Sequence, residues 1–216
     1  MTRQKIRVER IIERLEKIHP DAKLDLDYSN PLELLIALIL AAQARDELVR
    51  QITPDLFVKY RSAEDYAETP LSQLQRDIGK INFYRNKSRS IRNCCTELVK
   101  RFDGRVPDNL RDLLSLPGVG RKTANILLGN AFGKQTIGVD THVMRLSQRI
   151  GLTDKTDPEK AEHDLSAIVP ETQRVHFCHL LQYHGRRICI ARKPKCRECN
   201  VVSLCLYPAK TTERRS

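Results

Sequence analysis

LPGVGRKTA, residues 116–124, decides the fold, because it joins two predicted helices through a short turn that carries two glycines. The first helix ends at Leu116, since a proline disfavours helical backbone in the residue before it. Gly118 and Gly120 flank Val119, and glycine permits positive φ and leaves no side chain to keep a phosphate away. The amides of the turn and of the next helix N-terminus then face an anion. The stretch predicts a helix-hairpin-helix motif that grips a DNA backbone without reading sequence. An ordinary glycine-rich connector is the alternative.

Lys122 follows the second glycine and lies in the first turn of the second predicted helix. The positive end of the helix macrodipole and the adjacent Arg121 both disfavour its ammonium form, and partial burial would add to them. An amine must lose its proton before it attacks carbon, so this position suits a nucleophilic lysine. A lysine that only binds phosphate explains the position equally well.

Downstream of the hairpin, Val139-Asp140-Thr141-His142 opens another predicted helix, which runs to Ile150. Taken alone, Asp140 reads as an N-cap aspartate. Capping also fixes the carboxylate at a helix start, where it can serve a second, catalytic role. Both interpretations remain open on the residues alone.

The C-terminal end of the chain carries four cysteines in the pattern C-x6-C-x2-C-x5-C. Four thiolates on a compact loop can hold a tetrahedral zinc ion or an iron–sulfur cube. Spacing alone slightly favours zinc, because zinc sites are commoner, and sulfur ligation does not separate the two. The four candidate ligands are Cys189, Cys196, Cys199 and Cys205. Three histidines nearby are alternative ligands, although core or interhelical positions suit them better: His176, His179 and His184.

A basic segment lies between the first two of these cysteines. It contains Arg192, Lys193 and Lys195. On a loop anchored by a metal, three cations would form a stiff basic finger suited to phosphates. A solvated run of charge is the alternative.

Helix signals dominate the rest of the chain. An apolar stripe from Val8 to Ile18 predicts an amphipathic helix that ends at Pro20. Asn30-Pro31-Leu32-Glu33 reads as an N-cap, an N1 proline and an N3 glutamate. The helix that follows is apolar on every face from Leu34 to Ala42, which places it at the centre of a helical domain. Further helix starts are predicted at Asp46, Ser62, Thr69-Pro70, Asn86 and Pro107-Asp108. With no strand alternation, the chain is predicted to be all-α.

Composition narrows the class of protein and of partner. The 216 residues carry a net charge of +11, which favours a polyanionic partner such as nucleic acid. The longest uncharged apolar run, Leu34–Ala42, is far shorter than the ~20 residues of a membrane-spanning helix. No signal peptide is recognised, so we expect an intracellular protein whose seven cysteines do not form a disulfide framework.

Together these motifs resemble the endonuclease III family of bifunctional DNA glycosylases. The resemblance rests on LPGVGRKTAN (116–125), VDTH (139–142), HGR (184–186) and the four-cysteine loop. It covers nearly the whole chain, from AAQARD (41–46) to the last of these cysteines. The combination is far more specific than any single motif.

The resemblance implies an all-α fold of two helical domains that flank a DNA-binding cleft holding the active site. One domain is a six-helix barrel with the helix-hairpin-helix, residues 24–134. The other is discontinuous, residues 1–23 plus 135–216, and carries a [4Fe-4S] cluster rather than zinc. The four cysteines of the loop match the cluster ligands, and the cluster is expected to be structural.

The resemblance also implies residue roles. Lys122 matches the catalytic nucleophile and Asp140 the catalytic aspartate. Gln43 and Phe83 occupy positions that enter the DNA stack around an extruded nucleotide. The remaining residues expected to bind DNA are those of the hairpin turn and the basic loop: Gly118, Val119, Gly120, Arg192, Lys193 and Lys195.

The implied reaction begins when a damaged, oxidised pyrimidine is extruded from the duplex. Lys122 attacks C1′ of the sugar and displaces the base, while Asp140 stabilises positive charge on the sugar and assists proton transfer. The resulting Schiff base acidifies the 2′ proton, and β-elimination breaks the strand on the 3′ side. The expected partner is double-stranded DNA with damaged bases or abasic sites, bound by a monomer in the cytoplasm, at the nucleoid if the source is prokaryotic, and not at a membrane.

Two other functions compete with this interpretation. A monofunctional mismatch or photoproduct-type glycosylase of the same superfamily would share the fold and the aspartate. The related adenine-specific enzymes, however, lack this lysine and carry a further domain. A non-catalytic DNA-binding module would explain the hairpin and the charge, but has no need of a paired lysine and aspartate.

Several positions depart from the family pattern and bear on lesion preference. The family more usually has serine at Ala41, threonine at Arg45 and asparagine at Arg50. Near Phe83 it usually reads Gly-Leu, where this chain has Asn82-Phe83. A phenyl ring can stack on bases better than an aliphatic wedge, and Arg45 would add a cation near the pocket.

Overall fold

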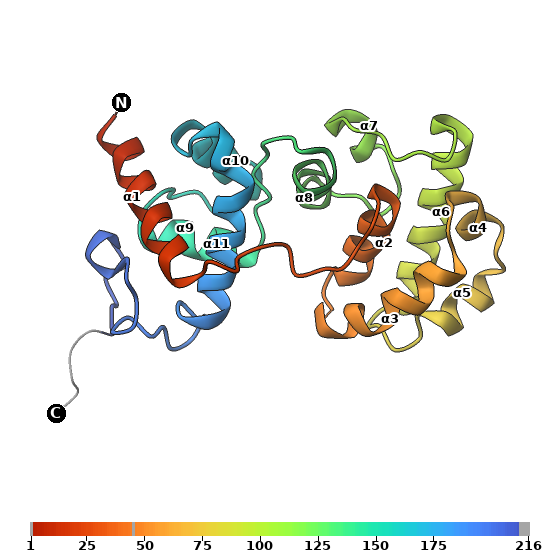
Figure 1. The fold of residues 1–216 in the computed structure, drawn as a ribbon, viewed down its shortest axis with the longest axis horizontal. Helices are drawn as coiled ribbons and strands as arrows, with labels where there is room; N and C mark the ends of the chain where they lie inside the picture. The colour runs from red at the N-terminus through yellow and green to blue at the C-terminus, as the bar shows by residue number, and fades with distance from the viewer. Residues whose placement is uncertain (1, 45, 212–216) are drawn as a thin grey trace. The chain divides into compact units, whose positions relative to one another are not determined.

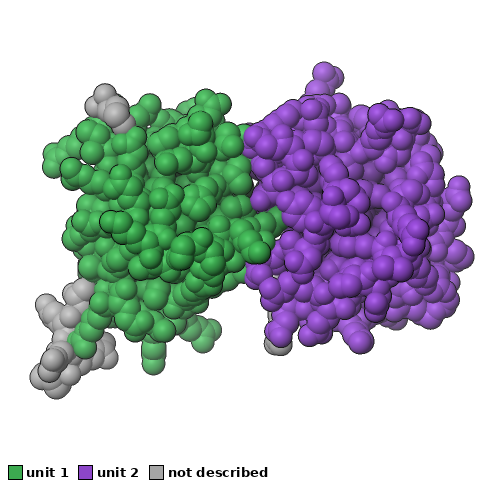
Figure 2. Space-filling model, in the orientation of Figure 1, with its two compact units in different colours: residues 1–24, 135–216 green, residues 25–134 purple. Residues whose placement is uncertain are grey.

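The computed structural model describes residues 2–44 and 46–211, apart from the side chain of Asp46. The chain divides into two compact units, residues 1–24 with 135–216 (unit 1) and residues 25–134 (unit 2), shown in green and purple in Figure 2. Across the described residues the regular elements are all helical, without a strand, so the all-α prediction is confirmed (Figure 1). No helix among these residues is long and apolar enough to cross a membrane.

Unit 2 is built around the apolar helix α2. This helix, Pro31–Ala41, is buried on every face from Leu34 to Leu40 and contacts α3, α6 and α8 of the same unit. The other helices of the unit are α3 (Asp46–Lys59), α4 (Ala63–Glu68), α5 (Leu71–Asp77), α6 (Tyr84–Phe102), α7 (Leu110–Leu114) and α8 (Arg121–Phe132). The central helix is where its sequence pattern predicts it, because an all-round apolar surface must be covered on every side.

Side-chain caps begin two helices of unit 2, α2 and α4, where the sequence predicts them. The Asn30 side chain accepts a hydrogen bond from the Glu33 amide and starts α2. Ser62 and Asp65 form a reciprocal capping box at α4. The predicted cap for α3, Asp46, is instead its first helical residue, and its side chain lies outside the described part.

Two expectations for unit 2 differ from the structure. The short helix before the hairpin, predicted to start at Pro107-Asp108, starts at Leu110 because Asn109 is its cap; the described residues of this unit form seven helices, and the six-helix barrel that the resemblance implies stays a prediction. The long basic helix α6 was expected to start at Asn86 but starts at Tyr84. It starts earlier because Phe83 adopts left-handed backbone and turns the chain into the helix without a side-chain cap.

Unit 1 joins the N-terminal helix to the C-terminal part of the chain. Its elements are α1 (Arg3–Ile18), α9 (Thr141–Ile150), α10 (Pro158–Ile168), the 3-10 turns η1 (Glu171–Gln173) and η2 (Val202–Leu204), and α11 (Arg174–Arg187). The apolar stripe of α1 packs into the core of this unit through Val8, Ile11, Ile12 and Leu15. Its last member, Ile18, is 37% exposed at the helix end.

Two arginines of α1 bind the C-terminal loop. The Arg7 guanidinium donates to the Leu204 carbonyl at 2.6 Å and to the Gly151 carbonyl at 3.2 Å. Arg14 donates to the Asn200 carbonyl at 3.2 Å. These bonds fix the loop that contains the last two cysteines of the C-x6-C-x2-C-x5-C pattern against the first helix of the chain.

Candidate active site and metal centre

The hairpin turn of unit 2 needs its first glycine for both conformation and space. Gly118 has φ +81°, and a Cβ built on it would lie 2.8 Å from the Ser90 Cβ of α6. Gly120 is the N-cap of α8 with extended backbone, φ −91° and ψ 170°, and no atom lies within 4 Å of a Cβ built there. The positive φ that glycine permits therefore occurs only at Gly118, while Gly120 leaves open space at the helix start.

Val119 holds the turn together rather than presenting a side chain to solvent. It is 6% exposed, and its amide donates to the Leu116 carbonyl at 3.2 Å. The two exposed glycines on either side of it form the outer surface of the turn. The hairpin can thus meet a phosphate with backbone only at its surface, which suits recognition independent of sequence.

Lys122 lies in the first turn of α8, and its side chain is exposed. The partial burial considered from the sequence is therefore absent. The N-cap Gly120 provides no side-chain cap, and no acidic residue occupies the first turn. From Ala124 to Leu128 the helix is buried in unit 2. The amine is thus carried on a rigid, buried helix and reaches solvent at its positive end.

Gln43 and Phe83 lie in two turns of unit 2 with unusual backbone. Gln43, two residues beyond the end of α2, has φ 54°, and Phe83, the N-cap of α6, has φ 60°. They are two of the three non-glycine residues with positive φ in the described chain, the third being Asp103. Gln43 is exposed and Phe83 is 60% exposed. Left-handed backbone in residues other than glycine is held by its surroundings and concentrates at functional sites.

The positions that depart from the family pattern have different surroundings. Ala41 is half-buried at the end of α2, and Asn82 is exposed beside Phe83. Arg50 forms a surface ion pair with Asp25, with 2.5 Å between Nη1 and Oδ1. Arg45 lies outside the described residues.

Asp140 belongs to unit 1 and caps α9. Its Oδ1 accepts a hydrogen bond from the Val143 amide at 2.7 Å, and the residue is half-buried. Ile137 and Val139, which precede it, are buried in the core of unit 1. The capping role expected from the sequence is present, and it involves one carboxylate oxygen.

The HGR motif marks a close approach of α9 to α11. A Cβ at Gly185 would lie 2.8 Å from His142 Nδ1 and 3.0 Å from Arg145 Nη2, so a larger residue would have to displace these side chains. Arg145 also donates to the carbonyls of Gly185 (3.0 Å) and Cys189 (3.1 Å). The motif therefore ties the helix that starts at Asp140 to the first cysteine of the loop.

The four cysteines of the loop line one cavity of unit 1, with Arg149 and His184 among its other walls. Among the described residues, no group of three or more His, Cys, Asp or Glu side chains is already closed in metal-ligand geometry. Burial raises the pKa of Cys199 to about 11, and its cysteine neighbours act in the same direction. A bound cation would therefore be needed to hold this thiol as a thiolate, which is the form that ligates metal.

Polar groups approach three of the four sulfur atoms. Arg149 Nη1 donates to Cys189 Sγ at 3.4 Å, and the Tyr207 amide donates to Cys205 Sγ at 3.5 Å. His184 Nε2 lies 3.3 Å from Cys199 Sγ. Such donors stabilise ligating thiolates and tune the metal that they hold. The donor set and its surroundings fit a thiolate-bound metal centre.

His184 is a buried partner of a cysteine, and it is held by a second histidine that sequence reasoning missed. His19 Nε2 lies 3.1 Å from His184 Nδ1, and both rings are at most 2% exposed. Burial lowers the pKa of His184 to about 4, so its ring is neutral and carries one N–H. If that N–H points to the Cys199 sulfur, Nδ1 accepts from His19. Nothing in the sequence indicates this pair, because its members lie at opposite ends of the chain.

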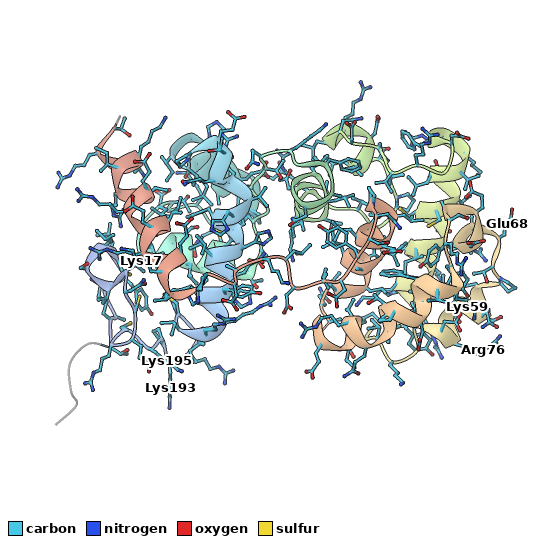
Figure 3. The ribbon with its side chains drawn as sticks, in the orientation of Figure 1. Lys17, Lys59, Glu68, Arg76, Lys193 and Lys195 are labelled. Atoms are coloured by element: carbon cyan, nitrogen blue, oxygen red, sulfur yellow. The ribbon has the colours of Figure 1, made fainter. Side chains whose placement is uncertain are left out.

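The basic loop of unit 1 is exposed and firmly anchored. Arg192, Lys193 and Lys195 are all exposed, and Figure 3 shows the side chains of the two lysines projecting outward from the loop. Arg149 holds the loop backbone by donating to the carbonyls of Ile190 (2.9 Å) and Ala191 (2.6 Å). The three cations are therefore presented on a fixed backbone.

Comparisons with known proteins agree on one family. Residues 36–171 match the HhH-GPD superfamily of base excision DNA repair proteins. Endonuclease III of Synechocystis sp. is 45% identical over 206 residues, which cover 95% of this chain and 94% of the relative. Endonuclease III of Bacillus subtilis is 41% identical, covering 92% and 91%.

Solved structures give the same result. The structure of a trapped endonuclease III–DNA covalent intermediate has a TM-score of 0.89 and 40% sequence identity, with 95% of this chain and 96% of that chain covered. The structure of a thermostable thymine-DNA glycosylase has a TM-score of 0.85 at 26% identity, with 93% and 96% covered.

Proposed function

We propose, from the premise that this chain belongs to the endonuclease III family of the HhH-GPD superfamily, that Lys122 and Asp140 are its catalytic residues. The chain is a bifunctional enzyme of base excision repair, a DNA glycosylase and an apurinic/apyrimidinic (AP) lyase. The observation that carries the residue assignment is the exposed Lys122 amine at the start of the buried helix α8, directly after the glycine turn. One of the similar solved structures is a trapped covalent intermediate of endonuclease III with DNA, and the exposed amine of Lys122 supports assigning the equivalent bond in this chain to that residue.

The proposed substrate is an oxidised pyrimidine extruded from duplex DNA, because C1′ of its sugar is out of reach inside the stack. The neutral Lys122 amine forms a bond to C1′ as the bond to the base breaks, and the base leaves with the electron pair. Loss of the amine proton and ring opening give a Schiff base. Removal of the 2′ proton then expels the 3′ phosphate by β-elimination. An abasic site enters the same route, with the C1′ oxygen of the sugar leaving as water in place of a base.

Asp140 has a role at the sugar in this proposal. Its carboxylate stabilises the positive charge that develops as the base leaves and assists proton transfer at the lysine. The hydrogen bond from the Val143 amide fixes the carboxyl group at the start of α9. A fixed charge costs no reorganisation during the reaction, which is why such groups are effective.

The hairpin, the basic loop and two turns supply the proposed DNA contacts. Gly118 and Gly120 present backbone to a phosphate, while Val119 supports the turn from inside. Gln43 and Phe83 enter the base stack, and their exposure supports this role. The DNA that the protein is proposed to bind is a duplex that contains a damaged base or an abasic site. We infer that a monomer acts on it in the cytoplasm, at the nucleoid in a prokaryote.

The metal centre is proposed to be a [4Fe-4S] cluster. Cys189, Cys196, Cys199 and Cys205 would hold it, and the groups beside three of the sulfurs support that assignment. Bound there, the cluster would cross-link the end of α11 to the C-terminal loop and stiffen the basic segment. We assign it no redox step in the reaction.

Metal analysis tests this assignment. Protein purified without oxygen should contain about four irons per chain, and Cys196→Ser should lose most of that iron because one ligand is removed. Cys94→Ser is the matched control, since Cys94 is buried in α6 of the other unit. Iron and zinc are measured together by elemental analysis. Stoichiometric zinc in the wild type would refute the cluster.

Charge reversal tests the basic loop. Changing its three cations to glutamate should weaken binding to duplex DNA and lower the slope of log K against log salt by up to about 3, since each lost phosphate contact removes about one unit. Fluorescence anisotropy at several salt concentrations measures that slope. A reversal of equal charge on exposed residues of α1 is the control: Lys5, Arg10 and Lys17. Equal slopes in the two triple variants would show that the loop does not contact DNA.

A further inference from the structure

Unit 2 contains one buried lysine that the proposed reaction does not use. Lys87 lies on α6 and is 6% exposed. Its Nζ donates to the Leu40 carbonyl at 2.7 Å. Burial lowers the pKa of this lysine. A buried ammonium group needs a compensating contact, and the Leu40 carbonyl provides one.

The Leu40 carbonyl is a group that needs such a donor. It belongs to the last turn of α2, where carbonyls have no partner within the helix and the helix dipole is negative. The last turn of α2 contains no basic residue of its own, and Leu40 is fully buried. Lys87 thus supplies to α2, from the neighbouring helix α6, the cation that complements its C-terminal end.

Lys87 also bonds to the turn before its own helix. Its amide donates to the Phe83 carbonyl at 3.0 Å, in the first turn of α6. The side chain of Lys87 bonds to the carbonyl of Leu40. Leu40 lies three residues before Gln43 in the sequence, and Gln43 follows the end of α2. One residue therefore connects the two turns whose left-handed residues, Gln43 and Phe83, are exposed.

We propose that Lys87 is a positioning residue, whose side chain holds the Gln43 turn and the Phe83 turn in a fixed relation so that both enter the DNA stack together. This proposal rests on the role assigned above to those two side chains. Two exposed side chains on separate turns can enter the same gap in a base stack only if the distance between the backbones of the two turns stays constant. The Nζ–carbonyl bond fixes that separation from within the core, without touching DNA.

Lys87→Met tests the proposal, because methionine has a similar length and suits a buried site but cannot donate to the carbonyl. The full-length enzyme with its cluster is assayed under single turnover on two duplexes, one with an oxidised pyrimidine and one with a preformed abasic site. Base excision should slow about 10- to 100-fold, since a misplacement of 1 Å can have such an effect. Strand cleavage at the abasic site should change less than about 3-fold, because no base has to be extruded there.

Two further measurements separate positioning from simple loss of structure. A fluorescent adenine analogue opposite the lesion reports unstacking, and its emission on binding should fall in Lys87→Met. Lys100→Met, at an exposed position of the same helix, is the control and should leave both rates and the emission unchanged. Lys87→Arg, which keeps a cationic donor, should recover part of the excision rate. Equal slowing of both reactions, or of neither, would overturn the proposal.

A double-variant cycle distinguishes failure of the positioning role from failure of the wedge assignment. If Lys87 acts through Phe83, combining Lys87→Met with Phe83→Ala should slow excision little more than Phe83→Ala alone, because coupled residues are not additive. Fully multiplicative effects would refute the positioning role while leaving Phe83 as a wedge. If Phe83→Ala and Gln43→Ala each leave excision unchanged, the wedge assignment itself is wrong, and the proposal is overturned with it. The cycle also applies to Lys87→Gln if the methionine variant does not fold.

Discussion

Lys122→Gln should abolish the covalent adduct that we expect borohydride to trap between this enzyme and abasic-site DNA. The adduct is a reduced Schiff base, and it forms only if a neutral amine of the protein has bonded to the sugar. Glutamine has no such amine, so strand cleavage should fall on the order of 10³-fold or more. Gel shift of the trapped species and single-turnover cleavage measure the two effects.

A second substitution at this position separates the nucleophile from the charge. Lys122→Arg keeps a cation at the start of α8, but a guanidinium stays protonated and cannot attack carbon. It should therefore lose the adduct as completely as the glutamine variant while binding abasic-site DNA close to wild-type affinity. Lys122→Gln should bind somewhat more weakly, because it also loses a phosphate-attracting charge. An adduct of undiminished yield in either variant would show that another amine is the nucleophile.

The local signals in the sequence predict much of the fold. Asn30 and Ser62 begin their helices because short polar side chains can bond the free amides of a first turn. The central position of α2 follows from its apolar residues on all faces. The glycine turn is also predictable, but only the structure shows that positive φ and the nearby Ser90 exclude a side chain at Gly118 whereas Gly120 has extended backbone.

Other features are not written in any local pattern. Nothing about phenylalanine predicts left-handed backbone at Phe83, where the carbonyl accepts from the Asn86 and Lys87 amides and no side chain caps the helix. Lys87 reads as one more cation in a basic helix, yet it is buried because a carbonyl 47 residues away needs a donor. The rings of His19 and His184 are in contact although 165 positions separate the two residues in the sequence. Contacts of this kind come from tertiary packing, and a single sequence shows only that their members have suitable side chains.

In the candidate metal centre, too, the sequence predicts some features, while others arise only from tertiary packing. The spacing of its cysteines predicts that four thiols gather on one loop, and they line one cavity. Sulfur ligands alone do not distinguish zinc from an iron–sulfur cluster, since both accept four thiolates. The family supports the cluster, and the donors beside the sulfurs belong to residues from α9, α11 and the C-terminal loop whose roles spacing does not reveal.

Asp140→Asn should lower single-turnover base excision about 10²- to 10³-fold while leaving the fold and DNA affinity intact. Asparagine caps a helix about as well as aspartate, so the bond from the Val143 amide survives. What the variant loses is the negative charge and the proton acceptor, and these are the properties that the reaction at the sugar requires. Thermal melting measures the stability of the fold, anisotropy with a non-cleavable abasic analogue measures DNA affinity, and excision kinetics measure the rate.

Asp140→Ala is the matched comparison, because it removes the cap as well as the charge. It should be less stable than the wild type by about 1 kcal/mol, the usual loss on removing an N-cap, and its excision rate should be no higher than that of the asparagine variant. The difference in stability between Asp140→Ala and Asp140→Asn then measures the contribution of the helix cap. The difference in excision rate between Asp140→Asn and the wild type measures the contribution of the negative charge. Wild-type turnover in Asp140→Asn, together with a destabilised alanine variant, would reduce Asp140 to a helix cap and require another carboxylate for the reaction.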